Sequence, residues 1–472
     1  MSTRILGPFN RVEGDLEVSL DIADGRVSAA YVNSPLYRGF EQMLPGKDPM
    51  DALVIVPRIC GICSVSQSAA AAKALRGLMG LTPPENGLLA EHLVTACENL
   101  ADHLTHFYLF FMPDFARPAY RDKTWFPRLA ARFKAVEGSA AADVLPARSA
   151  FMHLMGLMAG KWPHTLSLQP GGSARPLEQA EVLRLIALLR SFRRFLERHT
   201  FGDALEAVAG LDSLAALHRW RAGRGGDLAL FLEAAFDLGL ERVGRGTDRF
   251  LSYGAYEHFP AGIWDAGPAA FDPAAILEDL SSAWMAGETL APAQGISEPL
   301  LDKPGAYSWC KAPRYNGQVM ETGALARQMV AGHPLLRELV AACGGSVLAR
   351  VLARLLELAL VVPRMEAWAR QLVPGQAWCD HGKLPEEGSA MGLVEAARGA
   401  LGHWVSVRHG RIQNYQIIAP TTWNFSPRDA AGVPGALEQA LAGMAVDPDD
   451  PMPVAVQHVV RSFDPCMVCT VH

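Results

Sequence analysis

The sequence predicts a mainly α-helical protein with small β hairpins, in which the two ends of the chain meet at one site. Three observations predict this fold class: long segments with apolar residues at helical spacing, alternating segments around turn dipeptides, and a C-x-x-C pair near each end. The 472 residues contain no internal repeat and no low-complexity linker. We therefore expect a single domain that spans residues 1–472.

Three long segments carry the helical part of this prediction. Residues 88–112 repeat apolar side chains at helical spacing with few breakers. Residues 176–198 do the same, and Pro176 suits a first helical turn. A third helical region covers residues 322–372, with interruptions predicted at Gly344-Gly345 and at Pro363. Together these segments predict a long central helix bundle.

Two hairpins are predicted near opposite ends of the chain. Residues 15–32 alternate between apolar and polar side chains around Asp24-Gly25, a dipeptide that favours a tight turn. The segment "GHWVSVRHGRIQNYQII" predicts a second hairpin that turns at His409-Gly410.

Composition and charge exclude several classes of function. Half of the residues are hydrophobic and 19% are charged, which supports a large buried core or an extensive partner interface. A net charge of −6 is too small to indicate binding to nucleic acid or to an anionic membrane. The start, "MSTRILGPFNRVEGD", lacks the apolar core of a signal peptide, and no transmembrane segment of about 18 uninterrupted apolar residues occurs. We expect a cytoplasmic protein, with export of the chain bound to a partner as the alternative.

Four of the eight cysteines form two C-x-x-C pairs. Cys60 and Cys63 lie in "RICGICSVSQSAAAAKAL", where the alanine-rich helix that follows lowers the pKa of a thiol at its N-terminus. Cys466 and Cys469 lie in the closing "DPCMVCTVH". Zinc ribbons separate their pairs by about 15–20 residues, whereas almost the whole chain separates these two. A four-thiolate site for zinc, iron or nickel and two unrelated thiol pairs remain open, because ligand type does not choose among these metals.

The surrounding motifs narrow this choice. With its closing histidine and the two cysteine pairs, the chain resembles the large subunit of nickel–iron hydrogenases. Further segments of that family follow in the expected order over residues 7–472: "NRVEGDLEV", "YRGFEQML", "HLTHFYLF", "PGGSA", "KAPRYNGQVMETGALAR", "EAARGALGHWV" and "APTTWNFSPRD". The resemblance implies the large-subunit fold, a long central helix bundle with both chain ends at the metal site.

The resemblance also implies a cofactor and a reaction. Nickel would be bound by four thiolates, two of them shared with an iron that carries carbon monoxide and two cyanide ligands. Cys60 and Cys466 match the terminal nickel ligands, and Cys63 and Cys469 match the bridging ones. The implied reaction is heterolytic splitting of H2, with the terminal thiolate of Cys466 as the proton acceptor.

Five more residues match family positions around the metals. Glu13, in "RVEG", matches the carboxylate that relays the proton onward, although a surface or salt-bridged glutamate is the alternative. Arg398 matches the arginine held over the open metal position, where a fixed cation stabilises developing charge. By the same resemblance, Asp114 and Asp464 surround this arginine, and Thr421 hydrogen-bonds a cyanide ligand.

The last residue matches a second metal site. In the family, the final histidine, here His472, binds a hard cation, usually magnesium, together with the glutamate of "RGFE", here Glu41. A backbone carbonyl near Ile417 is the third protein ligand, and waters complete an octahedron.

The chain departs from the common family pattern at several positions. Gln67 replaces a histidine that hydrogen-bonds the bridging sulfur, and a glutamine donates one bond but cannot titrate. Ala397 replaces a proline, and the sequence stops at His472 without the extension that family precursors carry. Ile62 and Phe110 match gas-channel positions where many hydrogenases have smaller residues; ordinary core packing is the alternative.

Four of these departures, Gln67, Ile62, Phe110 and the absence of the extension, resemble the regulatory, H2-sensing branch of the family. They imply a slow hydrogenase that signals through a small subunit to a histidine kinase. The small subunit carries iron–sulfur clusters, and this chain offers no cysteine set for a cluster outside its two pairs. An energy-conserving uptake hydrogenase and a zinc-stabilised scaffold without redox activity are the competing interpretations.

Overall fold

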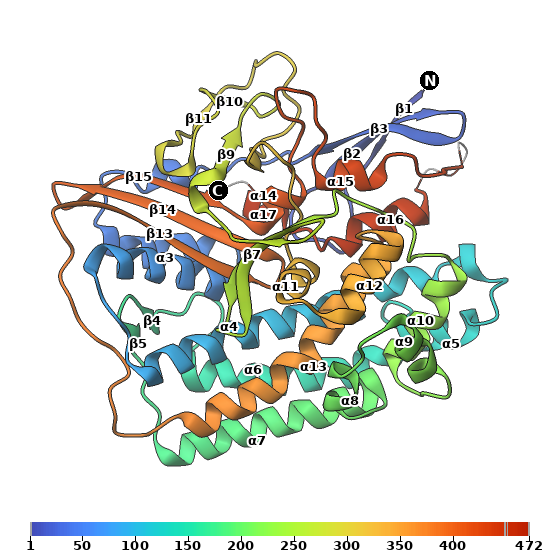
Figure 1. The fold of residues 1–472 in the computed structure, drawn as a ribbon, viewed down its shortest axis with the longest axis horizontal. Helices are drawn as coiled ribbons and strands as arrows, with labels where there is room; N and C mark the ends of the chain where they lie inside the picture. Colours follow the sequence, from blue (N-terminus) through green and yellow to red (C-terminus); the bar gives the residue numbers. More distant parts are fainter. Residues whose placement is uncertain (1, 448–449, 451, 471–472) are drawn as a thin grey trace.

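The computed structural model describes residues 2–447, 450 and 452–470 of the chain. Long helices occupy one side of the molecule and small antiparallel sheets the other, so the predicted mainly helical class with small β elements is confirmed (Figure 1). Among the described residues, no helix is both long and apolar enough to cross a bilayer.

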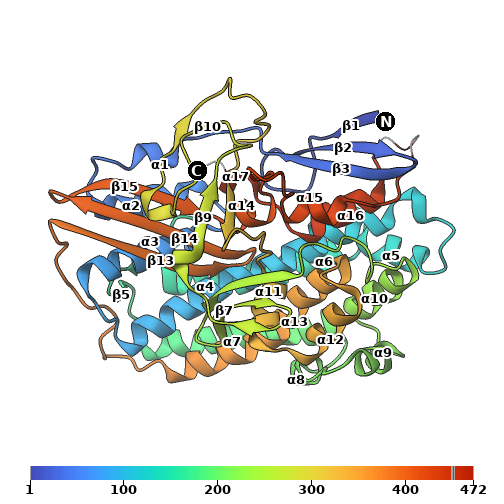
Figure 2. The same cartoon turned by 45° about the horizontal axis from the view of Figure 1, so that its top comes forward.

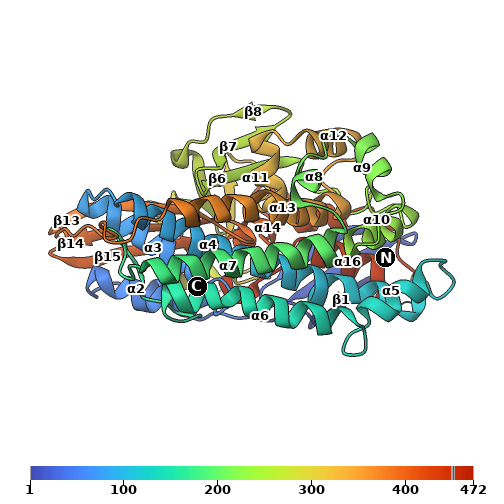
Figure 3. The ribbon, with the colours of Figure 1, turned by 90° about the horizontal axis from the view of Figure 1, so that it is seen from below.

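Four long helices form the central bundle. They are α4 (Glu85–Thr105), α6 (Ala140–Ala159), α7 (Gln179–Phe195) and α13 (Val347–Gln371). The view from below shows them side by side (Figure 3), and α4 contacts both α6 and α13, while α7 contacts the same two helices. Their apolar faces belong to the largest hydrophobic cluster of the protein, so burial holds the bundle together.

The first two predicted helices form, with corrected ends. Helix α4 begins at Glu85 and continues after Thr105 as a π-helical turn, His106–Phe111. Helix α7 begins at Gln179, so the prediction that Pro176 stands in its first turn is wrong. The physical reason is local: the Glu181 side chain accepts the N–H of Glu178 across 2.9 Å, which caps the helix three residues later than predicted.

The third helical region is divided differently from the prediction. It contains α11 (Ala324–Ala331), α12 (Pro334–Cys343) and α13. The break at Gly344-Gly345 is confirmed, but the break predicted at Pro363 is wrong, because α13 continues through this residue. Val361, Val362 and Met365 are fully buried around it, and this packing stabilises the helix despite the missing N–H.

Both predicted hairpins are present. Strands β2 (Glu17–Ala23) and β3 (Arg26–Asn33) pair and turn at Asp24-Gly25, and β1 (Ser2–Leu6) pairs with the other edge of β2. Strands β14 (Gly399–Arg408) and β15 (Arg411–Ile418) turn at His409-Gly410, where both residues have positive φ.

A further strand, β13 (Glu387–Ala396), was not predicted and completes the second sheet in the order β13-β14-β15. It joins β14 through a two-residue turn, Ala397-Arg398, since Ala396 pairs with Gly399. A Cβ at Gly399 would lie 2.4 Å from Thr322 Oγ1 and 2.6 Å from the nitrogen of Gly323. Only glycine therefore fits behind this turn.

The alanine-rich helix α3 (Ser64–Met79) packs against β13 and β14. At Gly392 in β13 a Cβ would lie 1.9 Å from the carbonyl oxygen of Ala70, so the helix and the strand approach closely. Small residues on both elements allow this contact, which places the start of α3 beside the sheet.

The remaining elements surround these parts. Figure 2 shows the C-terminal helices between the β13–β15 sheet and the β1–β3 sheet. The other helices are α1 (Phe40–Met43), α2 (Ala52–Ile55), α5 (Phe126–Phe133), α8 (Leu205–Ala209), α9 (Leu214–Arg221), α10 (Asp227–Asp237), α14 (Pro420–Asn424), α15 (Ala436–Leu441), α16 (Val454–Ser462) and α17 (Met467–Thr470). The other strands are β4 (Leu168–Gln169), β5 (Gly172–Ser173), β6 (Arg249–Ala255), β7 (Phe259–Asp265), β8 (Pro268–Ala269), β9 (Ile276–Asp279), β10 (Met285–Ala286), β11 (Glu298–Pro299) and β12 (Ala312–Tyr315).

Candidate metal centre

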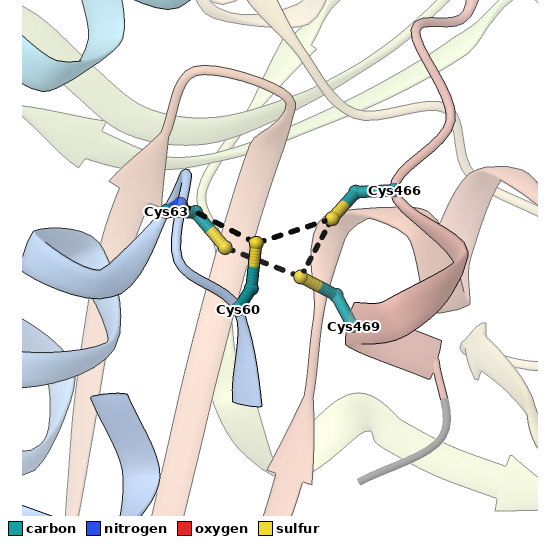
Figure 4. Close-up of side chains that lie close together, drawn as sticks. All are labelled: Cys60, Cys63, Cys466 and Cys469. Carbon is teal, nitrogen blue, oxygen red and sulfur yellow. Dashed lines mark hydrogen bonds between the residues drawn. The ribbon is translucent and has the colours of Figure 1, made fainter. Parts of the chain in front are cut away.

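The two cysteine pairs meet in space, as the sequence predicted. Figure 4 shows the sulfur atoms of Cys60, Cys63, Cys466 and Cys469 pointing toward one another, two from each end of the chain. All four Sγ atoms lie within 4.8 Å of one another and all four residues are buried. Cys63 precedes α3 directly, while Cys469 lies in α17.

The four thiols form no disulfide. The Sγ atoms of Cys60 and Cys466 are 3.5 Å apart, those of Cys63 and Cys469 3.2 Å, and those of Cys466 and Cys469 3.1 Å. A disulfide would bring two sulfurs to about 2.05 Å. The spacing suits thiolates that share a metal.

The electrostatics of the cluster also fit a metal. Hydrogen bonding with Cys466 lowers the pKa of Cys60 well below its usual range. Hydrogen bonding with the same neighbour raises the pKa of Cys63 well above that range. Four buried sulfurs in contact can all ionise only when a cation balances them, so this donor set fits a soft divalent metal.

The backbone holds the two ends of the chain together. Glu13 forms an isolated parallel bridge with Cys466, and the N–H of Met467 donates to the carbonyl of Glu13 across 2.7 Å. The guanidinium of Arg38 donates to the carbonyls of Ile59 and Val468, one from each cysteine segment. Sequence reasoning missed Arg38, although an arginine beside the "GFE" segment was visible.

Glu13 lies half-buried in this junction. Burial raises the pKa of its carboxyl above the usual value, Arg398 acts to lower it, and Cys60 raises it again. The charges of Arg398 and Cys60 thus both act on this carboxyl. The structure places Glu13 next to Cys466, a terminal ligand candidate, and its role as a proton relay stays a prediction.

Arg398 occupies the two-residue turn between β13 and β14 and is buried. Its Nε donates to the backbone carbonyl of Asp464 across 2.9 Å, and its Nη2 lies 3.1 Å from Oδ1 of the same residue. Its Nη1 lies 3.0 Å from Oδ2 of Asp102. Burial opposes the charge of Arg398, but Asp102 and Asp464 raise its pKa well above the usual value.

The second carboxylate at Arg398 is therefore Asp102, and the expectation of Asp114 is wrong. Asp114 pairs instead with the guanidinium groups of Arg11 and Arg461, the latter at 2.5 Å. The reason is position along the chain: Asp102 lies in α4, whereas Asp114 follows the π-helical turn that ends at Phe111. Asp102 is a charged residue inside an apolar helical segment, a signal that could have identified it.

The pKa values of the two carboxylates at Arg398 shift in opposite directions. Burial raises the pKa of Asp102 to about 8, against the lowering effect of Arg398. Burial also acts on Asp464, but there Arg398 and His106 hold the pKa below the usual value. Asp464 is thus the ionised partner of the arginine near neutral pH.

Thr421 lies in α14 and contacts the cluster through Cys466, whose N–H donates to Thr421 Oγ1 across 3.2 Å. Its predicted hydrogen bond to a cyanide ligand stays a prediction.

Gln67 is buried in the first turn of α3, and its Oε1 lies 2.8 Å from Nε2 of His403. Nδ1 of His403 lies 2.8 Å from the hydroxyl of Tyr415. The predicted bond from Gln67 to a bridging sulfur stays a prediction.

Glu41 is buried near the candidate hard-cation position. Its Oε1 accepts the N–H of Ile417 across 2.7 Å, so the glutamate and this backbone lie together as expected. Nζ of Lys311 is 3.0 Å from Glu41 and 3.5 Å from Glu278, and the sequence did not indicate either neighbour. The third expected ligand, His472, lies outside the described residues.

The two gas-channel candidates lie on different elements. Ile62 stands between Cys60 and Cys63 and packs against the hydrophobic cluster that contains all four cysteines. Phe110 belongs to the π-helical turn after α4, is half-buried, and its carbonyl accepts Nη1 of Arg11 across 2.9 Å. The channel role of the pair stays a prediction.

Comparisons with known proteins agree with this geometry. The family described as nickel-dependent hydrogenase matches residues 38–121 and 141–472. The periplasmic NiFeSe hydrogenase large subunit of Desulfomicrobium baculatum is 29% identical, covering 99% of this chain and 94% of that protein. The uptake hydrogenase large subunit of Azotobacter chroococcum mcd 1 is also 29% identical, covering 99% and 95%.

Solved structures extend the similarity to the whole fold. The Ni-Fe-Se hydrogenase of D. vulgaris Hildenborough in the reduced state superposes with a TM-score of 0.85 at 29% identity, covering 100% of both chains. This similarity confirms the predicted large-subunit fold.

Proposed function

The chain belongs to the nickel-dependent hydrogenase family and is a hydrogenase large subunit, and from this premise we propose that Cys60, Cys63, Cys466 and Cys469 hold a nickel–iron centre that splits H2 heterolytically. The observation that carries the proposal is the buried cluster of four sulfurs within 4.8 Å, built from both ends of the chain. When bound, the nickel–iron pair, with carbon monoxide and two cyanides on the iron, supplies the soft site at which the H–H bond breaks.

The side chains around the cluster handle the proton and the charge. Cys466 is the proposed proton acceptor, because a metal-bound thiolate keeps part of its basicity. Glu13 is the proposed next carrier: it adjoins Cys466 through the backbone, and burial raises the pKa of its carboxyl toward the range useful for proton transfer. Arg398, oriented by Asp464 and Asp102, presents a fixed cation toward charge that develops during splitting.

A hard cation, magnesium by family analogy, is proposed at Glu41, the carbonyl of Ile417 and His472. The hydrogen bond from the N–H of Ile417 places Glu41 at the backbone of the proposed third ligand, and carboxylate and carbonyl oxygens are suitable ligands for magnesium. Magnesium measured in wild type and in His472→Ala tests this part. Equal magnesium content in the two proteins would remove His472 from the site.

Electrons require a partner. Outside the two pairs, Cys97, Cys310, Cys343 and Cys379 stand singly, and the four-cysteine cluster is the one candidate metal group among the described residues. We propose a small subunit with iron–sulfur clusters as the electron acceptor, forming a heterodimer with this chain.

Within the family, we propose the H2-sensing role in the cytoplasm, with a histidine kinase reached through the small subunit. Gln67, Ile62 and Phe110 support it, because all three match positions at which the sensing branch departs from the common family pattern. The second candidate is an uptake hydrogenase, which the names of several relatives favour.

The experiment for the reaction uses the heterodimer purified without air. We expect nickel and iron in it, infrared bands from carbonyl and cyanide ligands, and exchange between H2 and D2O. Zinc in place of nickel, with no exchange, would overturn the proposal.

A separate experiment distinguishes the two roles. In the source cell, deletion of this chain should abolish H2-dependent induction of other H2-oxidising genes if it is a sensor, and complementation should restore that induction. Unchanged induction with loss of H2-dependent respiration would assign the uptake role instead.

A further inference from the structure

We propose that Arg327 is a positioning residue for Arg398: its guanidinium holds the two-residue turn that presents Arg398 to the cysteine cluster. Arg327 lies in α11 and is fully buried. Its Nη1 donates to the carbonyl of Ala396 across 3.0 Å, and its Nη2 donates to that of Ala397 across 3.3 Å. The inference rests on the role proposed above for Arg398.

Two carboxylates fix the guanidinium of Arg327. Nε and Nη2 bind the two oxygens of Glu357 at 3.0 and 2.8 Å, and Nη1 binds Oε2 of Glu395 at 2.7 Å. Glu357 comes from α13 and Glu395 from β13 itself. A planar guanidinium with a forked partner has little freedom to rotate, so its two remaining contacts with the turn are directional.

The carboxylates are held in turn by other elements. Nε2 of His103, the neighbour of Asp102 in α4, lies 3.2 Å from Oε1 of Glu357. The N–H of Tyr253 donates to Oε1 of Glu395 across 2.7 Å. The network therefore connects helices α4, α11 and α13 with strands β6 and β13 at the back of a single turn.

A second set of contacts, at Gly399, also restrains the position of this turn. Gly399 lies against Thr322 and Gly323, and the N–H of Arg327 donates to the carbonyl of Gly323 across 3.0 Å. The backbone of the turn that carries Arg398 thus contacts the start of α11 on one side and the guanidinium of Arg327 on another. Asp464 and Asp102 then orient only the side chain of Arg398, from a backbone that is already placed.

The buried ion pairs of Arg327 with Glu357 and Glu395 support a role in positioning the turn rather than in stability. Arg327, Glu357 and Glu395 are fully buried or nearly so, and such ion pairs add little net stability because desolvation offsets their attraction. Apolar residues of similar volume would fill the space as well. What apolar residues could not supply is a pair of donors aimed at the carbonyls of Ala396 and Ala397.

The test compares Arg327→Lys with the matched control Arg314→Lys in the purified heterodimer. Arg314 is also a buried arginine, binding Asp429 at 2.9 Å and the carbonyls of Pro313 and Pro427 at 3.0 and 3.1 Å. Lysine keeps the charge in both variants but removes the fork that reaches several acceptors. Where Arg327→Lys fails to fold, the neutral double variant Arg327→Gln with Glu357→Gln replaces it.

Two measurements are made on each variant at equal nickel content. In Arg327→Lys, we expect amide hydrogen exchange in residues 396–400 to become about tenfold faster, and H2/D2O exchange about tenfold slower, as loss of one hydrogen bond from a charged donor would cause. In Arg314→Lys, both quantities should stay as in wild type. Amide protection of 396–400 equal to wild type in Arg327→Lys, or equal loss of protection in Arg314→Lys, would overturn the inference. Amide exchange does not depend on H2 chemistry. The amide measurement therefore tests the contact between Arg327 and the turn even if the wild-type heterodimer does not split H2.

Discussion

Glu13 pairs with Cys466 through the backbone in an isolated parallel bridge, although the two residues come from opposite ends of the chain. The N–H of Glu13 donates to the carbonyl of Pro465 across 3.4 Å, and the N–H of Met467 donates back to the carbonyl of Glu13. The carboxyl of Glu13 is thus placed beside a ligand candidate by main-chain bonds, which leaves the side chain free to carry a proton.

Cys466→Ala should abolish both nickel retention and H2-dependent activity. The change removes one of four sulfurs within 4.8 Å and with it the proposed proton acceptor. Nickel content and H2/D2O exchange are the measurements. Cys97→Ala, at a buried cysteine in α4 outside the cluster, should keep both. Full nickel occupancy with wild-type activity in Cys466→Ala would contradict the assignment.

Glu13→Gln should keep the metals but suppress isotope exchange with solvent. The amide preserves size while removing the ionisable group on which Arg398 and Cys60 act. The measurement is H2/D2O exchange per nickel. Glu17→Gln, in strand β2, serves as the control and should exchange like wild type. Equal exchange in the two variants would move the proton route to another residue.

Asp464→Asn should slow H2/D2O exchange per nickel, whereas Asp114→Asn should lower stability without slowing that exchange. Asp464→Asn removes the ionised partner of Arg398 and breaks a buried ion pair, so H2/D2O exchange per nickel should fall and the thermal midpoint should fall as well. Asp114→Asn leaves Arg11 and Arg461 without their carboxylate, and breaking a buried pair costs about 3–5 kcal/mol of unfolding free energy. Exchange lost in Asp114→Asn at full stability would restore Asp114 to the site.

Ile62→Val with Phe110→Leu should keep H2 oxidation but make it decay in air. Each change removes side-chain volume at a proposed channel position, Ile62 beside the cysteines and Phe110 in the π-helical turn after α4, and a wider path admits O2 more readily than the present one. Such large-to-small changes cost about 1–3 kcal/mol, so folding is checked by thermal unfolding first. The control is Ile59→Val with Phe107→Leu, buried neighbours of the same types. A channel role is excluded if the two double variants lose activity in air at the same rate.

His458→Gln should weaken the acid sensitivity of folding. Burial lowers the pKa of His458 to about 4, and its Nε2 lies 2.8 Å from the hydroxyl of Tyr120. The unfolded state binds the proton first, so the stabilisation present above about pH 6.5 is lost as the pH falls toward 4. At about 1.4 kcal/mol per pH unit, this amounts to about 3 kcal/mol. Unfolding free energies of both proteins between pH 4 and 7 test it; parallel curves would assign the acid sensitivity to other groups.

Much of the fold followed from local patterns. The helical period of residues 88–112 predicted α4, and Asp24-Gly25 and His409-Gly410 predicted two turns, because these signals depend only on neighbours in the chain. Strand β13 was missed since its core-facing pattern is interrupted by glycines, which are present because α3 packs closely on it.

The sequence by itself determined the four ligand candidates, because the two C-x-x-C pairs stand among further segments that resemble the nickel–iron hydrogenase family; the spacing alone left two unrelated thiol pairs open. Only the tertiary structure decided what surrounds them. That Asp102 rather than Asp114 reaches Arg398 depends on the path of α4 past the β13–β14 turn, and that Arg327 reaches the same turn depends on how α11 and α13 pack. Such contacts join residues far apart in the chain, and their geometry follows from packing whole elements together, which no local pattern encodes.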